Sequence, residues 1–283
     1  MNKLSLFISI ILLSIALSYS QENPVRYMQN TNMLKVGGNF LRDSYLSPLK
    51  YGGVSVGYGF ESYRFLSAGD HSLILRDAGD ISFDFDDNPA KNASFWGIGV
   101  NFSINPMWKI VGNLPFSIYA GPGVRAFLGG LYCTRNGNNP ASLKLGADIE
   151  GMVLATYRLK WESCPILASV SWQTSLLGTT FSTQYGESYY ELFMIREGSG
   201  VAKGMNFTIP SKAWYNEINL NFDFPIKNIM TLRAGYQLSN YNTNINHLHT
   251  SKLMQSFVIG FTRHLNVIKG KAAVEKKNAE LIF

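Results

Sequence analysis

The sequence predicts an all-β fold: a single closed antiparallel transmembrane β-barrel of about ten strands, with twelve as the alternative, after a cleaved signal peptide. Three observations support this fold class. The chain opens with a short apolar leader, no later apolar run is long enough for a membrane-spanning helix, and long segments alternate apolar with polar residues. Strands are therefore the means by which we expect the chain to cross a bilayer.

The leader has the pattern of a secretory signal peptide. Lys3 precedes the apolar run from Leu4 to Leu17, and Ser18 and Ser20 are small residues near its end. The apolar core of roughly 14 residues is shorter than the roughly 20 that a membrane-spanning helix needs. We therefore expect residues 1–20 to be removed by cleavage between Ser20 and Gln21, rather than retained as an anchor.

The composition favours strands and argues against several functional classes. Gly 26, Tyr 15 and Phe 18 in a chain with 16% charged residues indicate sheet structure rather than disorder. The net charge of +6 is modest and the Lys and Arg residues are scattered, so we expect no nucleic-acid partner. We find no metal or nucleotide motif, and predict no cofactor. Expected partners are outer-membrane lipid, lipopolysaccharide and the barrel-assembly machinery.

Alternation is clearest between residues 214 and 224. Trp214, Ile218 and Phe222 belong to one face, which we predict meets lipid, while Tyr215 and Glu217 belong to the other. Similar alternation occurs in segments 97–104, 143–161 and 166–176. A secreted β-sandwich is the alternative, but its polar face would carry more Lys and Glu than the Ser, Gly and Asn found here.

The alternation and the turn residues between segments divide the chain into about ten strands. We place them near 33–42, 51–66, 71–86, 94–105, 115–129, 142–160, 165–179, 212–224, 229–242 and 248–263. An even number returns both ends to the periplasm. The inner connections are then 67–70, 106–114, 161–164 and 225–228, and the outer ones are 43–50, 87–93, 130–141, 180–211 and 243–247.

This layout gives three segments: a signal peptide (1–20), an outer-membrane barrel (21–265) and a periplasmic tail (266–283). Within the last strand, Leu253 to Phe261 alternates aromatic and aliphatic residues and resembles the assembly signal of outer-membrane proteins. The layout also separates the two cysteines, since Cys133 falls in an outer loop and Cys164 in an inner turn. A wall of about 25 Å between them far exceeds the roughly 7 Å that a disulfide allows, so we predict two free thiols.

The barrel interior is expected to hold charged side chains of both signs. A ten-strand barrel is narrow, and its interior is usually filled by side chains. Buried charges there need partners, so we predict an ion-pair network that stiffens the wall, with a solute path or binding pocket as the alternative. The predicted members are Arg125, Asp148, Glu150, Arg158, Glu217, Asp223, Arg233 and Lys252.

The most suggestive catalytic pattern is His249-Thr250-Ser251 at the outer end of the last strand. Residues i and i+2 share a strand face, where an imidazole can activate a hydroxyl. The pair resembles the His-x-Ser arrangement of outer-membrane phospholipases and lipid A deacylases, which implies lipid or acyl hydrolysis. Those families follow the pair with an Asn and then an Asn or Glu that orients the histidine, whereas Lys252 and Leu253 follow here.

Two other features have weaker functional interpretations. Asp84, Asp86 and Asp87 resemble the carboxylates of ten-stranded outer-membrane proteases, but the Asp-x-His pair of those enzymes is missing and Asp86-Asp87-Asn88-Pro89 is typical of a turn. The outer loop 180–211 is unusually aromatic. It either folds back to plug the barrel mouth, which we favour, or presents its aromatic side chains to a glycan, peptide or protein.

Two stretches, Asp43 to Tyr51 and His247 to Ser251, resemble a family of small outer-membrane barrels from Gram-negative gut-type anaerobes, classed as a domain of unknown function. The resemblance implies a barrel over nearly the whole mature chain and implies no activity. We therefore expect an outer-membrane protein with a structural, ligand-binding or narrow-transport role. A lipid or acyl hydrolase that uses His249 and Ser251 is the alternative.

Overall fold

The computed structural model describes residues 26–66, 72–112, 115–159, 165–195, 201–226 and 230–267. The predicted cleavage site at Ser20 and Gln21, and residues 268–283 of the predicted tail, lie outside these ranges. No helix within them is long and apolar enough to cross a membrane. The strands are β1 (Arg26–Asp43), β2 (Ser47–Phe65), β3 (Leu73–Asp87), β4 (Ser94–Val111), β5 (Phe116–Cys133), β6 (Ala141–Leu159), β7 (Ile166–Phe181), β8 (Met205–Thr208), β9 (Ala213–Ile226), β10 (Met230–Ile245) and β11 (Leu248–Val267).

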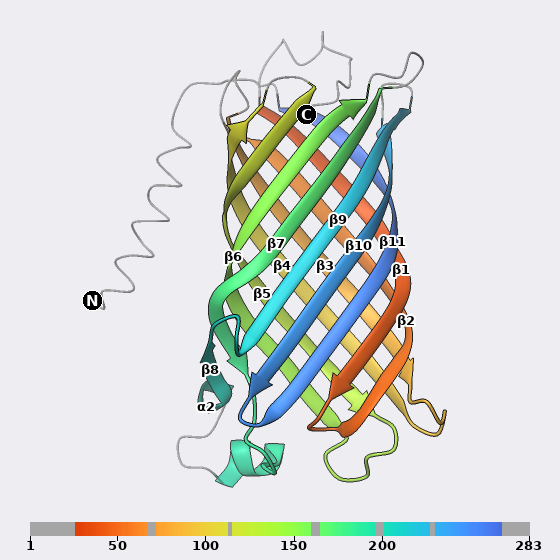
Figure 1. The fold of residues 1–283 in the computed structure, drawn as a ribbon, viewed down its shortest axis with the longest axis vertical. Coiled ribbons are helices and arrows are strands. Elements are labelled where there is room, and N and C mark those ends of the chain that lie inside the picture. The colour runs from red at the N-terminus through yellow and green to blue at the C-terminus, as the bar shows by residue number, and fades with distance from the viewer. Residues whose placement is uncertain are drawn as a thin grey trace, which may run out of the picture.

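The described strands form one antiparallel sheet that closes on itself (Figure 1). From β1 to β7, and again from β9 to β11, each strand pairs with the next. The β7–β9 and β1–β11 ladders then complete a ten-strand barrel. The short strand β8 pairs only with the outer end of β7 and lies outside the wall. Because Arg26 is opposite Val267, the barrel begins and ends at the same rim, which we assign to the periplasm.

The predicted alternation sets the two faces of the wall. In β9, Trp214, Ile218 and Phe222 are exposed on the outside, whereas Tyr215 and Glu217 are buried inside. The same pattern gives the other strands an apolar exterior, with exposed fractions of 73% at Phe257 and 62% at Phe40. In water this surface would be unfavourable; in lipid it is the expected outer belt. The chain is thus a β-barrel of the bacterial outer membrane.

Several strands are longer than predicted. β1 starts at Arg26 rather than residue 33. β4 passes through Pro106 to Val111, so most of the inner turn predicted at 106–114 is strand. The β4–β5 register has a gap between Ile104 and Trp108, which suits a proline that has no N–H to donate.

Two outer loops are also shorter than predicted. The connection expected at 43–50 is the three-residue turn 44–46, and the one expected at 243–247 is Asn246-His247. Asn246 and His247 have φ of 53° and 62°, as a two-residue hairpin turn requires. Small positive-φ turns let strands pair to their ends, which alternation alone does not reveal. The β7–β9 connection remains long and includes the π-helical turn η1 (Glu191–Ile195) and the short helix α2 (Val201–Gly204).

Apolar side chains gather inside the barrel at two levels. Near the outer rim, Tyr51 stacks on Phe95 with ring centroids 3.8 Å apart. We call the group around them the outer cluster: Leu41, Leu46, Tyr51, Ala93, Phe95, Leu131 and Cys133. Toward the periplasmic rim lies the inner cluster: Tyr63, Phe65, Ile74, Met107, Tyr119, Met152 and Leu154.

Candidate functional site

Between the two clusters the interior is polar, and its centre is the carboxylate of Glu61 on β2. Glu61 Oε1 accepts a hydrogen bond from Arg76 Nε at 2.7 Å, and Oε2 accepts one from Arg233 Nη1 at 2.6 Å. Arg233 also forms two parallel bonds to Asp223, at 2.8 and 2.9 Å. All four side chains are buried, so each charge is matched where water cannot screen it.

Arg76 extends this network across the barrel. Its Nη1 donates to the oxygens of Ser103, Asn105 and Gln173, on strands β4 and β7. The amide of Asn105 in turn donates to Glu150 of β6 at 2.7 Å. Side chains from strands on different sides of the barrel are thereby joined, which stiffens the wall and leaves a cavity of only about 40 Å³ at this level.

Arg125 of β5 organises the next level toward the outside. It forms an ion pair with Asp148 and lies against two rings, with its guanidinium carbon 3.7 Å from the centroid of Tyr215 and 4.8 Å from that of Phe127. The hydroxyl of Tyr215 donates to Glu217. A guanidinium enclosed by a carboxylate and aromatic faces is held rigidly, so this layer also narrows the lumen.

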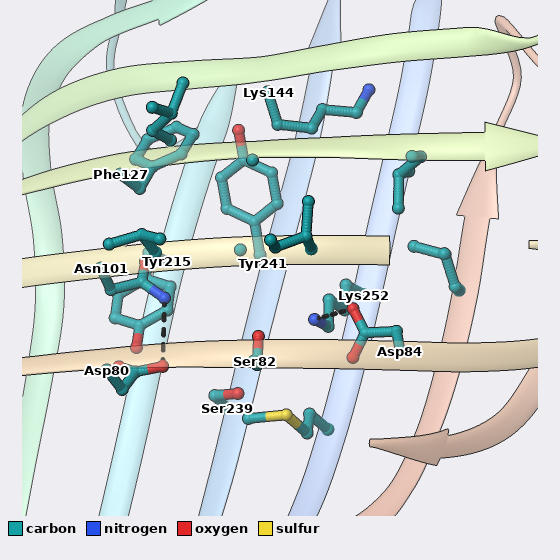
Figure 2. Close-up of a pocket in the computed structure, with 18 of the residues that line it drawn as sticks. Asp80, Ser82, Asp84, Asn101, Phe127, Lys144, Tyr215, Ser239, Tyr241 and Lys252 are labelled. Atoms are coloured by element: carbon teal, nitrogen blue, oxygen red, sulfur yellow. Dashed lines mark hydrogen bonds and ion pairs between the residues drawn. The ribbon is translucent and has the colours of Figure 1, made fainter. Parts of the chain in front are cut away.

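A cavity of about 110 Å³ lies beyond this layer (Figure 2). Lys252 donates to Asp84 across it at 2.5 Å, and Asn101 donates to Asp80 at 3.5 Å. Small side chains such as Ser82 and Ser239 line the remaining wall and leave the space open. A cavity of this size with charged and hydroxyl side chains in its lining has room and hydrogen-bond partners for several ordered water molecules.

The structure places all eight predicted network residues on the lumen side of their strands. Seven take part in the contacts above, whereas Arg158 lies at the periplasmic end of β6, opposite Leu167 of β7. Sequence reasoning missed the residues that join the parts, chiefly Glu61, Arg76, Asp80 and Tyr215. The alternation indicates that these side chains point into the lumen. Their partners lie on distant strands, so the sequence does not show which residues they contact. In the described portion, Cys133 is a free thiol, and Cys164 falls outside it.

In the described part of the long outer loop, one aromatic side chain packs on the barrel rim and others are exposed. Tyr189 accepts a hydrogen bond from the Leu143 backbone N–H at 2.6 Å, and its ring lies edge-on to Tyr45 with centroids 5.6 Å apart. Burial and the neighbouring Tyr189 raise the pKa of Tyr45 to about 12, so this contact is neutral at physiological pH. Tyr185 and Tyr190 point outward, with exposed fractions of 75% and 68%.

The His249–Ser251 pair lies on the outside of β11, beyond the apolar belt. His249 Nε2 is 2.9 Å from Oδ1 of Asn242 on β10, and Asn242 is directly opposite Ser251. On the other side, Arg42 of β1 is opposite Ser251. The described side chains form no hydrogen bond between His249 and Ser251. An amide partner for the imidazole does exist, but the neighbouring strand supplies it, which the linear pattern did not reveal.

The three aspartates at the top of β3 do not act together. Asp84 bonds Lys252 and Asp86 accepts from Asn39 at 2.8 Å, both inside the lumen, whereas Asp87 is on the outer face and accepts from Ser94 at 2.6 Å. Among the described residues, no group of three or more His, Cys, Asp or Glu side chains is arranged to hold a metal ion. The predicted turn at Asp86-Asp87-Asn88-Pro89 is shorter than expected, because Asp86 and Asp87 still belong to β3 and pair with Phe95 and Ser94.

Several solved structures share the barrel form. The outer-membrane protease OmpT from Escherichia coli matches with 8% identity and a TM-score of 0.49, over 88% of this chain and 100% of that one. The transport unit of the E. coli autotransporter AIDA-I matches with 9% identity and a TM-score of 0.43, over 86% of this chain and 91% of that one. Neisserial surface protein A matches with 10% identity and a TM-score of 0.32, over 83% of this chain and 95% of that one. At such values the likeness says nothing of activity.

No curated protein matches the chain. A family model does, over residues 4–272, which is nearly the whole sequence and includes both stretches on which the sequence resemblance rested. The family is described only as a protein of unknown function, so it supplies neither a substrate nor a site. This chain belongs to the DUF3316 family.

Proposed function

We propose that this protein is a sealed outer-membrane barrel that conducts no solutes and acts as a binding protein through its outer surface. The observation that carries the proposal is the filling of the lumen. The outer and inner clusters lie toward its two ends, on the side formed by β1 to β6, and the Glu61 and Arg125 networks occupy the levels between them. The cavities beside these networks measure only about 110 and 40 Å³. A solute would have to displace packed rings and break buried ion pairs, which disfavours a transport role.

The outer surface offers more for a partner to contact. The β7–β9 connection presents Tyr185, Tyr190 and Met194, with 68–75% of each side chain exposed. Aromatic residues at an exposed rim contribute large contact areas at small entropic cost. A binding role therefore fits the division between a rigid, filled interior and an aromatic exterior loop.

Conductance tests the proposal directly. The purified barrel is reconstituted into planar lipid bilayers, with folding verified by its heat-modifiable electrophoretic mobility and a general porin as positive control. We expect no stable conductance steps at voltages where the porin opens. Regular steps from the folded protein, or swelling of protein-loaded liposomes in sugar solutions, would contradict a sealed lumen.

A second candidate function is acyl-ester hydrolysis at Asn242, His249 and Ser251. The observation that favours it is the 2.9 Å contact between His249 and the Asn242 side chain, since an amide that orients an imidazole is what the sequence pattern lacked. The site lies on the outer face of β11, just beyond the apolar belt along which lipid acyl chains would lie. After a side-chain rotation, His249 would accept the Ser251 hydroxyl proton as Oγ attacks the ester carbonyl, and would then protonate the leaving alcohol. Water would release the acyl group from serine.

Substitution separates this candidate from the first. Ser251→Ala is compared with wild type for turnover of a chromogenic acyl ester and of outer-membrane phospholipid in mixed micelles. The neighbouring rim histidine gives a matched control as His247→Asn, which keeps a residue tolerant of the positive φ. Hydrolysis requires that Ser251→Ala abolishes turnover and His247→Asn does not. Equal rates in all three proteins, or none in wild type, eliminate the hydrolase.

A further inference from the structure

An apolar groove of about 730 Å³ lies on the outside of the barrel, near the outer rim of β3 to β6. Its floor is formed by outward-facing aromatic side chains, among them Phe85 of β3, Trp96 of β4 and Tyr132 of β5. The exposed fractions of these three are 57%, 56% and 44%. Gly130 of β5 also lines the floor and leaves it deep at that point.

The outer loop provides the other side of the groove. Tyr189 and Phe193 line it, with their rings stacked at a centroid distance of 6.2 Å. The bond from Leu143 N–H to the Tyr189 hydroxyl fixes this pair to β6. The groove is thus held open by a hydrogen-bonded, ring-stacked support and does not depend on an occupant to form.

The position of the groove indicates what occupies it. Its floor continues the apolar belt that meets lipid, since Phe83 and Ile98 line it and belong to the same outward faces of β3 and β4. Its volume falls within the roughly 300–1,000 Å³ of ligand sites that bury most of a small apolar molecule. At this level of the barrel, the molecules next to the wall are outer-leaflet lipids.

Charged residues lie in the loops beyond the floor. The β5–β6 loop is tied to the start of β4, where the β3–β4 loop ends, because Ser94 N–H donates to Thr134 Oγ1 at 2.9 Å. Each loop carries an exposed cation, Lys91 in one and Arg135 in the other, with the exposed carboxylate of Asp87 nearby. The loop segment on the other side of the groove carries carboxylates, the half-exposed Glu187 and the exposed Glu191, so the cations are confined to the β3–β4 and β5–β6 side. An anionic head group above a buried chain would lie on that side.

We propose that this groove seats an acyl chain of an outer-leaflet phosphoglycolipid with the chemistry of lipid A, as a specific site rather than as part of the general lipid contact. The inference rests on the proposed function, because it names the ligand class bound at the outer surface. The chain lies on Trp96 and Tyr132 and is covered by Tyr189 and Phe193. The phosphate faces Lys91 and Arg135.

The test fills the groove without disturbing the wall. A Cβ added at Gly130 would meet only the Ser142 carbonyl oxygen, at 3.9 Å, so Gly130→Leu puts a side chain into the groove. Gly38 of β1 offers a matched control on another part of the belt, because a Cβ there would meet only the Gly53 carbonyl oxygen at 4.0 Å. Wild type and the two variants are purified with added lipid A and examined by native mass spectrometry.

We expect one lipid A to remain on wild type and on Gly38→Leu after detergent exchange, and at least tenfold lower occupancy on Gly130→Leu. Equal retention by all three proteins, or a protein dimer that Gly130→Leu disrupts in place of a lipid adduct, overturns the assignment. Conductance measured on the same samples keeps the two proposals apart. If the barrel does not conduct and lipid A retention is the same with and without Gly130→Leu, only this inference is refuted. If the barrel conducts, the sealed lumen is refuted.

Discussion

Arg233 on β10 extends through the lumen to Glu61 on β2, where Nη1 and Oε2 are 2.6 Å apart. The two strands are not neighbours in the sheet, since β1 and β11 lie between them. Glu61 also holds Arg76 of β3, so one carboxylate balances two buried guanidinium groups. The contact therefore braces the barrel across its interior and leaves it dependent on a single residue.

Glu61→Gln is expected to lower the free energy of unfolding by about 3–5 kcal/mol, because it removes the charge between two buried cations. The measurement is chemical unfolding in detergent, followed by tryptophan fluorescence. Glu191→Gln makes the same chemical change at an exposed carboxylate of the outer loop and should leave the transition nearly unchanged. If the Glu61→Gln midpoint matched that of wild type, the network would not be a source of stability.

The sequence predicted the wall far better than the interior contacts. Alternation is a local property, so it predicted that Trp214 points outward and Glu217 inward. Counting the alternating segments predicted ten strands. Strand ends were less predictable, because small turns such as Asn246-His247 allow pairing almost to the last residue. Lumen partners were not predictable at all, since Glu61 and Arg233 are 172 positions apart and a single sequence holds no signal that joins them.

The same limit applied to the rim. His249 and Ser251 share a face by spacing alone, yet the amide beside His249 comes from Asn242, which is brought near by the β10–β11 register. The apolar groove was also hidden, because it combines the outward faces of four strands with Tyr189 and Phe193 from a loop. Sites built from several elements appear only when their packing is known.

Cys133 lies within the outer cluster and is only 2% exposed. Its thiol should therefore resist a water-soluble maleimide while the barrel is folded. The measurement is the rate of labelling in a Cys164→Ser background, before and after unfolding in hot denaturant, which serves as the control. Complete labelling of the folded protein within minutes would mean that water reaches the outer cluster, contrary to a sealed mouth.

Tyr189→Phe should loosen the outer loop without unfolding the barrel. The change removes the acceptor for the Leu143 N–H, a loss of about 1 kcal/mol, and keeps the ring that contacts Tyr45. The readout is the rate of limited proteolysis within residues 182–212, which we expect to rise several-fold. Tyr190→Phe removes an outward hydroxyl from the next residue and should leave the rate unchanged. Identical cleavage of both variants would show that the hydrogen bond does not anchor the loop.

Gly146 and Gly130 give opposite predictions for one kind of substitution. Gly146 is directly opposite Phe127, and a Cβ there would lie 2.6 Å from that ring and 2.6 Å from the Thr179 carbonyl oxygen. Gly146→Ala must therefore displace Phe127, which contacts Arg125, and should cost about 1–3 kcal/mol of stability. Gly130→Ala meets only one atom, at 3.9 Å, and should change stability by less than about 0.5 kcal/mol. Unfolding midpoints of the two variants decide the matter. Equal midpoints would mean that Phe127 moves freely, and the rigid layer around Arg125 would then be wrong.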